Sequence, residues 1–214
     1  MSERFRSIRT PRSQTGAKGA LVAACVFALG AALGVFSKWL DSLALDSTIG
    51  WHRVLEALDL GNFFSELAPW LLLALVIAVF SPSAPRAALN VFCFFAGMCA
   101  AYQVSSVVIA GFDPGGYMLL WYGLTLLSPL AAVLCWYARG SGAVPIVLDI
   151  GITAVFALSC FALGLVYISL KGWLYLLVFV GAVAALYRSP KQLAVSLPAG
   201  LLLAFALSPV WPFQ

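Results

Sequence analysis

Charged residues are scarce in this sequence. Only 9% of its 214 residues are Asp, Glu, Lys or Arg, whereas 63% are hydrophobic, and the mean hydropathy is +1.02. A soluble domain carries roughly 25% charged residues and about 45–50% apolar ones. A water-soluble fold of this length could not bury so much apolar surface. The composition therefore excludes a soluble protein and indicates that lipid covers most of the exterior.

The common enzyme and metal motifs are also missing. The one histidine, His52, lies far from all five cysteines, and no Cys-x-x-Cys pair occurs, which argues against a metal cluster. The sequence contains no Gly-x-Ser-x-Gly elbow, no His-Glu-x-x-His motif and neither of the glycine-rich nucleotide-binding loops. We therefore expect no enzymatic activity, and hence no catalytic residues, no metal and no cofactor.

The basic residues are concentrated at the start of the chain. Five of the twelve lie within residues 1–18, namely Arg4, Arg6, Arg9, Arg12 and Lys18. We expect residues 1–18 to form a disordered cytoplasmic tail that meets anionic lipid headgroups and binds no nucleic acid. Residues 19–214 then form one transmembrane domain. Cleavage of the first apolar run as a signal peptide is a minor alternative, because that run is long for such a peptide.

Seven apolar runs predict an all-α bundle of membrane-spanning helices. The hairpin of the second and third runs, residues 61–103, is expected to be the centre around which the others pack. The second run is short for a hydrocarbon layer about 30 Å thick, so its helix should begin earlier, near Asn62, or the bilayer should be thinner there. The predicted spans cover residues of about 19–37, 66–80, 87–110, 117–138, 144–168, 172–187 and 192–209.

The distribution of basic residues predicts the topology. With the N-terminus inside, nine basic residues fall on the inner side and three on the outer side. The positive-inside rule then favours seven spans in the cytoplasmic membrane, with the N-terminus in and the C-terminus out. In the long outer loop, residues 51–58 have the apolar spacing of a short helix on the membrane surface.

Asp149 is the one carboxylate within an apolar run. A charge at this depth is costly and usually has a partner or a proton. Arg86 and Arg139, on predicted inner turns, are the candidate partners. The site is either an ion or proton site or a structural ion pair. Asn90 and Gln103 either hydrogen-bond between helices or line a small polar cavity.

The first span contains a helix-packing motif. Gly30 and Gly34 form a Gly-x-x-x-Gly pattern, which lets another helix approach closely. This helix is either a neighbour in the same chain or part of a second subunit, which would be another membrane protein or a second copy.

Several short segments resemble an uncharacterised family of small multi-span bacterial integral membrane proteins, a domain-of-unknown-function group. The resemblance covers about the last three quarters of the chain and implies a multi-span fold with no catalytic residues. Where the family has two tyrosines after Ala101, this chain has Tyr102 and Gln103. The matching segments are LGNFFS (60–65), SPSAPRAALNVF (81–92), FFAGM (94–98), AY (101–102), SP (128–129), WYARG (136–140) and LYRSPK (186–191).

Two functional hypotheses follow from these observations. The first is a non-enzymatic, membrane-embedded accessory or interaction protein whose partner docks on the small-residue face of the first span. The second is a small carrier or permease subunit with a polar site around Asp149.

Overall fold

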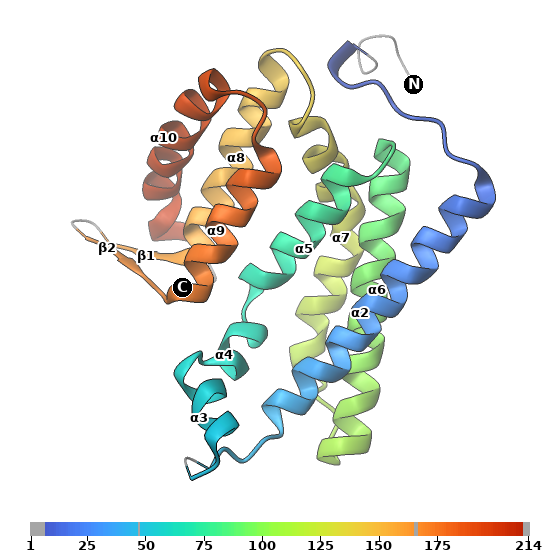
Figure 1. The fold of residues 1–214 in the computed structure, drawn as a ribbon, viewed down its shortest axis with the longest axis vertical. Coiled ribbons are helices and arrows are strands. Elements are labelled where there is room, and N and C mark those ends of the chain that lie inside the picture. The colour runs from blue at the N-terminus through green and yellow to red at the C-terminus, as the bar shows by residue number, and fades with distance from the viewer. Residues whose placement is uncertain (1–6, 47, 165–166, 212–214) are drawn as a thin grey trace.

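The computed structural model describes residues 7–46, 48–164 and 167–211, and within them the chain forms nine α-helices and one β-hairpin (Figure 1). The strands β1 (Phe161–Leu163) and β2 (Ile168–Leu170) are antiparallel, with Phe161 opposite Leu170. A short 3-10 turn, Ser208–Val210, follows the last helix. The helices are α2 (Gly16–Asp41), α3 (Gly50–Ala57), α4 (Leu60–Ser65), α5 (Leu67–Phe80), α6 (Ala84–Ala110), α7 (Gly116–Ala138), α8 (Ala143–Cys160), α9 (Trp173–Leu186) and α10 (Pro190–Leu207).

The helices form two groups, with α2, α6 and α7 on one side and α8, α9 and α10 on the other (Figure 1). Helix α5 lies between them, and its sequence is apolar on all sides, as suits a helix that packs against both groups. Its Trp70 and Ala78 pack in the core with α6 and α7. Its Leu75 and Val79 pack in the core with α8 and α9. Within the predicted central hairpin, α5 is therefore the element that joins the two groups.

Large aliphatic side chains cover the outside of the long helices. Leu126 is 74% exposed and Leu202 is 71% exposed. Among the described residues, five helices are long and apolar enough to cross a bilayer: α2, α6, α7, α8 and α10 with the turn that follows it. The chain is therefore a multi-pass membrane protein. The other two apolar helices, α5 and α9, have 14 residues each, about 21 Å of rise, so the number of seven spans stays a prediction.

The fifth predicted span, 144–168, is wrong at its C-terminal end. Helix α8 stops at Cys160, and Phe161 is the first residue of β1. Aromatic and β-branched residues around Gly164 are compatible with extended structure, and the antiparallel pairing of Phe161 with Leu170 selects it over a further helical turn. The helix that remains has 18 residues, about 27 Å of rise, which nearly crosses the hydrocarbon layer.

Residues 7–18 of the basic tail pack on the bundle, contrary to the predicted disorder, and residues 1–6 lie outside the described residues. The backbone N–H of Arg12 donates to the carbonyl oxygen of Pro82 at 2.8 Å, and that of Ser141 donates to the carbonyl oxygen of Ile8 at 2.8 Å. The Arg188 side chain donates to the carbonyl oxygen of Gly140. The tail and the turns 81–83, 139–142 and 187–189 thus meet at one end of the bundle, which we call the tail end.

The loop after α2 contains the predicted surface helix. Residues 51–58 were expected to be helical, and α3 covers Gly50–Ala57. Asn62 lies in α4, which is separated from α5 by the extended backbone of Glu66, so the second predicted span is preceded by a short, distinct helix. His52 is buried, and its Nδ1 accepts a hydrogen bond of 2.8 Å from the backbone N–H of Asp46.

Candidate functional site

Asp149 lies in a buried polar cluster between α8 and α10. Its side chain accepts a hydrogen bond from the Gln192 amide, and the Nη2 atom of Arg188 is 3.8 Å from its Oδ2 atom. The Gln192 amide also donates to Ser196 Oγ at 2.9 Å. Gln192 and Ser196 are four residues apart and therefore share one face of α10. The cluster ties α8 to α10 through polar contacts.

Neither arginine expected from the sequence is the partner of Asp149. The guanidinium of Arg86 occupies the space beside Gly19 at the start of α2, where the glycine has no side chain to displace it. The guanidinium of Arg139 lies 5.0 Å from the ring centroid of Phe80. Asp149 lies on the side of α8 that packs on α10, which brings it to Arg188, just before that helix.

Asn90 and Gln103 do not join Asp149 in a polar cavity. Asn90 is buried near the start of α6 and donates to Ser81 Oγ at 3.0 Å. Gln103 lies 13 residues further along α6, about 20 Å away. There it donates to Asp113 Oδ1 at 2.5 Å and accepts from the hydroxyl of Tyr122 at 3.3 Å.

The small-residue face of α2 packs within the chain. A Cβ atom at Gly30 would collide with the carbonyl oxygen of Phe94, and one at Gly34 with that of Met98. A Cβ atom at Gly97 of α6 would likewise collide with the carbonyl oxygen of Phe27 in α2. These three glycines allow the backbones of α2 and α6 to touch. This face is therefore covered by α6 and does not provide the docking surface for a second subunit that the sequence suggested.

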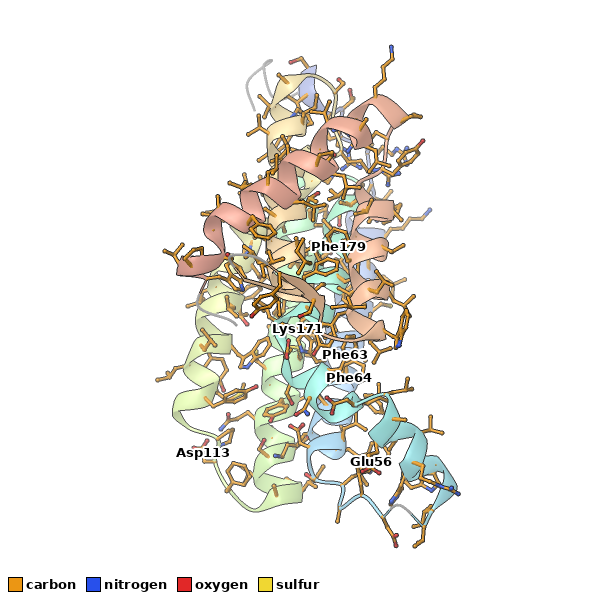
Figure 2. The ribbon with its side chains drawn as sticks, turned by 90° about the vertical axis from the view of Figure 1, so that its left-hand side faces the viewer. Glu56, Phe63, Phe64, Asp113, Lys171 and Phe179 are labelled. Carbon is orange, nitrogen blue, oxygen red and sulfur yellow. The ribbon has the colours of Figure 1, made fainter. Side chains whose placement is uncertain are left out.

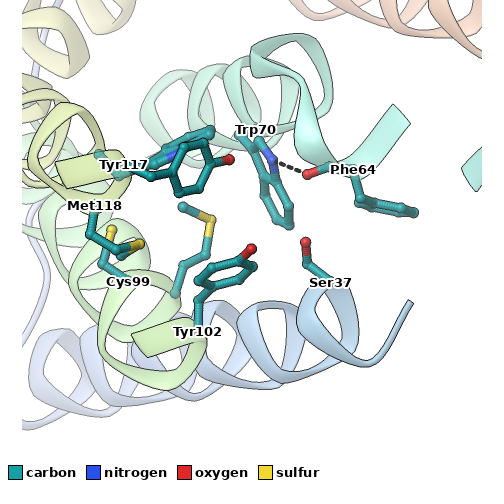
Figure 3. Close-up of a pocket in the computed structure, with 9 residues that line it drawn as sticks. Ser37, Phe64, Trp70, Cys99, Tyr102, Tyr117 and Met118 are labelled. Carbon is teal, nitrogen blue, oxygen red and sulfur yellow. Dashed lines mark hydrogen bonds between the residues drawn. The ribbon is translucent and has the colours of Figure 1, made fainter. Parts of the chain in front are cut away.

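A cavity toward the end of the bundle opposite the tail end is too small for a ligand (Figure 3). It is lined by aromatic and sulfur-containing side chains, and the indole N–H of Trp70 donates to the carbonyl oxygen of Phe64 at 2.9 Å beside it. Its volume of about 20 Å³ is enough for about one water molecule. The residues that line it are Ser37, Phe64, Trp70, Met98, Cys99, Tyr102, Tyr117, Met118 and Trp121.

A larger cavity, which we call the inter-layer groove, runs between the two groups of helices. Its volume is about 470 Å³. The one hydroxyl among its lining residues, that of Ser128, already donates to the carbonyl oxygen of Thr125 at 2.8 Å. The lining residues are Leu67, Leu71, Ala74, Leu75, Val91, Phe95, Leu124, Leu127, Ser128, Ala131, Ala132, Leu134, Cys135, Val147, Leu148, Gly151, Ile152, Val155 and Phe156.

A second cavity, which we call the mouth, adjoins the groove on the side away from the tail end. The mouth has a volume of about 240 Å³ and shares Leu67 and Leu124 with the groove. Glu66 and Lys171 form an ion pair in it, with Oε2 and Nζ 3.2 Å apart. Figure 2 shows Lys171 set back from Glu56 and Asp113 toward the middle of the molecule. The other lining residues of the mouth are Ser65, Ala68, Tyr117, Leu120, Trp121 and Ser159.

Sequence reasoning missed the groove. The one available signal was the group of small residues on helices that face one another, such as Ala74, Ala131 and Gly151. In an apolar run, however, small residues are as typical of close helix packing as of a cavity. Gly30 and Gly151 illustrate the two cases. A Cβ atom at Gly30 would collide with the carbonyl oxygen of Phe94, whereas a Cβ atom at Gly151 would meet no atom within 4 Å.

Within the described residues, no group of three or more His, Cys, Asp or Glu side chains is placed to hold a metal ion. Comparison with known proteins adds no family: no family model, no curated protein and no solved structure matches the chain. The family resemblance of the short segments is thus without support from these comparisons. The fold and composition show a multi-span helical membrane protein.

Proposed function

We propose that the chain is a non-enzymatic accessory protein of the cytoplasmic membrane that holds a lipid-like amphiphile in the inter-layer groove. The observation that carries this proposal is an apolar groove of about 470 Å³ that shares Leu67 and Leu124 with the mouth, the cavity that contains the Glu66–Lys171 ion pair. An apolar lining on four helices suits a hydrocarbon chain, and the ion pair suits a polar or zwitterionic headgroup.

The physical argument concerns what fills the groove. An empty groove deprives its lining of dispersion contacts. Water needs two to four polar partners to occupy a cavity, and the only lining hydroxyl, that of Ser128, is already engaged. Membrane lipid is the abundant material around these helices, and its chains have the same polarity as the leucines of the groove.

The proposed orientation places the tail end in the cytoplasm. Arg9 and Arg12 belong to the tail, Arg139 and Arg188 belong to two of the turns that meet there, and Arg86 lies in the first turn of α6 beside them. Figure 2 shows Glu56 and Asp113 together at the opposite end. This separation supports seven spans with the N-terminus inside and the C-terminus outside, and it places the mouth of the groove toward the outer leaflet.

Gly151 offers a direct test. A phenylalanine there would place its ring in the groove, because Gly151 lines the groove and no atom lies within 4 Å of its Cβ position. Gly123 of α7 is a matched control, since its Cβ position is also open but it does not line the groove. Overlap with a ligand typically costs about 1–3 kcal/mol, which lowers affinity roughly five- to hundredfold.

The measurement is mass spectrometry of what co-purifies with the full chain in mild detergent. An amphiphile that is retained by the wild type and by Gly123→Phe, and is lost from Gly151→Phe, supports the proposal. Absence of any bound amphiphile from the wild type, or equal retention by Gly151→Phe, would overturn it.

The carrier hypothesis is the second candidate, and the cluster around Asp149 favours it. Nε and Nη2 of Arg188 are buried and have no hydrogen-bond partner among the described residues, so the cluster has donor capacity for a small anion or water. A carrier predicts that Asp149→Asn abolishes uptake while folded protein stays in the membrane. Normal growth and normal amounts of membrane protein in cells that carry Asp149→Asn would leave the cluster with a structural role only.

A further inference from the structure

A further cavity lies at the tail end and shares no lining residue with the inter-layer groove. Its volume is about 570 Å³. It exists because the tail folds back on the turn before α6, where the backbone N–H of Arg12 donates to the carbonyl oxygen of Pro82. Three arginines line it, and among the described residues no carboxylate does. The lining residues are Arg9, Thr10, Arg12, Val79, Phe80, Ser81, Pro82 and Arg139.

Two of these guanidinium groups are held in place by contacts with the ends of helices. Arg9 donates to the carbonyl oxygens of Trp136 and Val79, at 2.6 and 2.8 Å, and lies 4.5 Å from the Trp136 ring centroid. It therefore caps the C-termini of α7 and α5, where a cation is favourable. Arg139 lies over the Phe80 ring. Because a guanidinium has five N–H donors, most of the donors of this cluster remain available.

The three positive charges are not balanced by a nearby carboxylate of the described chain. Burial lowers the pKa of Arg9, and the positive charges of Arg139 and Arg12 lower it further. Asp149 pairs with Arg188, and Glu56 and Asp113 lie at the opposite end. Capping of the two helix ends explains the position of Arg9. It does not explain the position of the exposed Arg12, which lines the same cavity.

We propose that this cavity binds a phosphate group, with Arg9, Arg12 and Arg139 as its ligands. Planar guanidinium groups recognise phosphate through paired N–H donors. Basic pockets at the cytoplasmic ends of membrane helices are suited to anionic headgroups. The phosphate belongs either to an anionic phospholipid of the inner leaflet or to a soluble phosphate compound. This site does not depend on the inter-layer groove.

The decisive variants are Arg12→Gln and Arg139→Gln. The Arg12 side chain is exposed, and the backbone N–H that holds the tail is kept in the variant, so the fold should survive. Arg53→Gln is the matched control, because Arg53 is exposed on α3 and its loss changes the net charge equally. Each arginine near an anionic headgroup contributes about fivefold in affinity. The double variant Arg12→Gln/Arg139→Gln should thus bind about 25-fold more weakly.

Native mass spectrometry of the full chain with phosphatidylglycerol and phosphatidylcholine is the measurement, together with the shift of the unfolding temperature in inorganic phosphate. Preferential binding of phosphatidylglycerol, weakened in both cavity variants and not in Arg53→Gln, supports a lipid headgroup. Stabilisation by inorganic phosphate alone, lost in the same variants, supports a soluble phosphate compound. The proposal is overturned if neither the lipids nor inorganic phosphate binds, or if the cavity variants bind them as the wild type does. Gly151→Phe should leave this binding unchanged.

Discussion

Replacing Arg188 with glutamine is expected to destabilise the chain through Asp149, whereas the same change at Arg139 or Arg86 is not. The carboxyl group of Asp149 is almost completely buried, with 1% relative exposure. Removing the charge of Arg188 leaves that carboxylate without a cation, because Arg139 lies over the Phe80 ring and Arg86 beside Gly19. The three arginines therefore distinguish the pairing in the structure from the pairings that the sequence suggested.

The magnitude follows from the geometry. Two unit charges separated by 3.8 Å attract by about 4 kcal/mol at an effective dielectric constant of about 20. Two effects reduce the cost of losing this attraction. The Gln192 amide still donates to Asp149, and the carboxyl group can take up a proton. We expect Arg188→Gln to lower the free energy of unfolding by about 2–4 kcal/mol.

A double-mutant cycle isolates the pair. Asp149→Asn should suppress part of the effect of Arg188→Gln, with a coupling energy above about 1 kcal/mol. Unfolding of the purified full chain in mixed micelles of increasing sodium dodecyl sulfate content provides the free energies. Parallel cycles of Asp149 with Arg139 and with Arg86 serve as controls. A coupling below about 0.5 kcal/mol for Arg188, or a larger coupling for Arg139 or Arg86, would refute the reasoning.

Two further predictions concern packing and topology. Gly34→Leu should lower the free energy of unfolding by about 3 kcal/mol, since its Cβ would collide with the carbonyl oxygen of Met98. Gly16→Leu, in open space on the same helix, should change it by no more than about 0.5 kcal/mol; equal stability of the two variants in the same micelle assay would contradict the α2–α6 packing. A reporter that works only in the cytoplasm should be silent when fused to the C-terminus. Strong reporter activity there would contradict the proposed orientation.

The long helices could be located from the sequence because the patterns that define them are local. Apolar runs and turn signals such as Asp113-Pro114-Gly115 predict where α6 ends and α7 begins, and α6 ends at Ala110 while α7 begins at Gly116. The end of α8 was missed because the apolar run of residues 161–168 is compatible with either a helix or a strand. Only the pairing of Phe161 with Leu170 separates the two, and this pairing depends on residues nine positions apart.

The partners of the buried residues likewise could not be predicted from the sequence. The position of Asp149 within an apolar run was sufficient to mark it as unusual and in need of a partner. Its partner depends on which face of α8 meets α10, and helical periodicity within one segment does not contain that information. Gly30 and Gly34 likewise mark a close helix contact, but their motif does not name α6 as the neighbour.

By itself, the sequence determined that the chain is a multi-pass helical membrane protein, because hydrophobicity is a property of composition and needs no partner. It also determined which residues are costly in lipid. Only the tertiary structure decided that the tail docks at one end, that Arg188 faces Asp149, and that a groove lies between the two groups of helices. These features arise from the relative rotation and spacing of helices, which depend on how side chains distant in the sequence fit together.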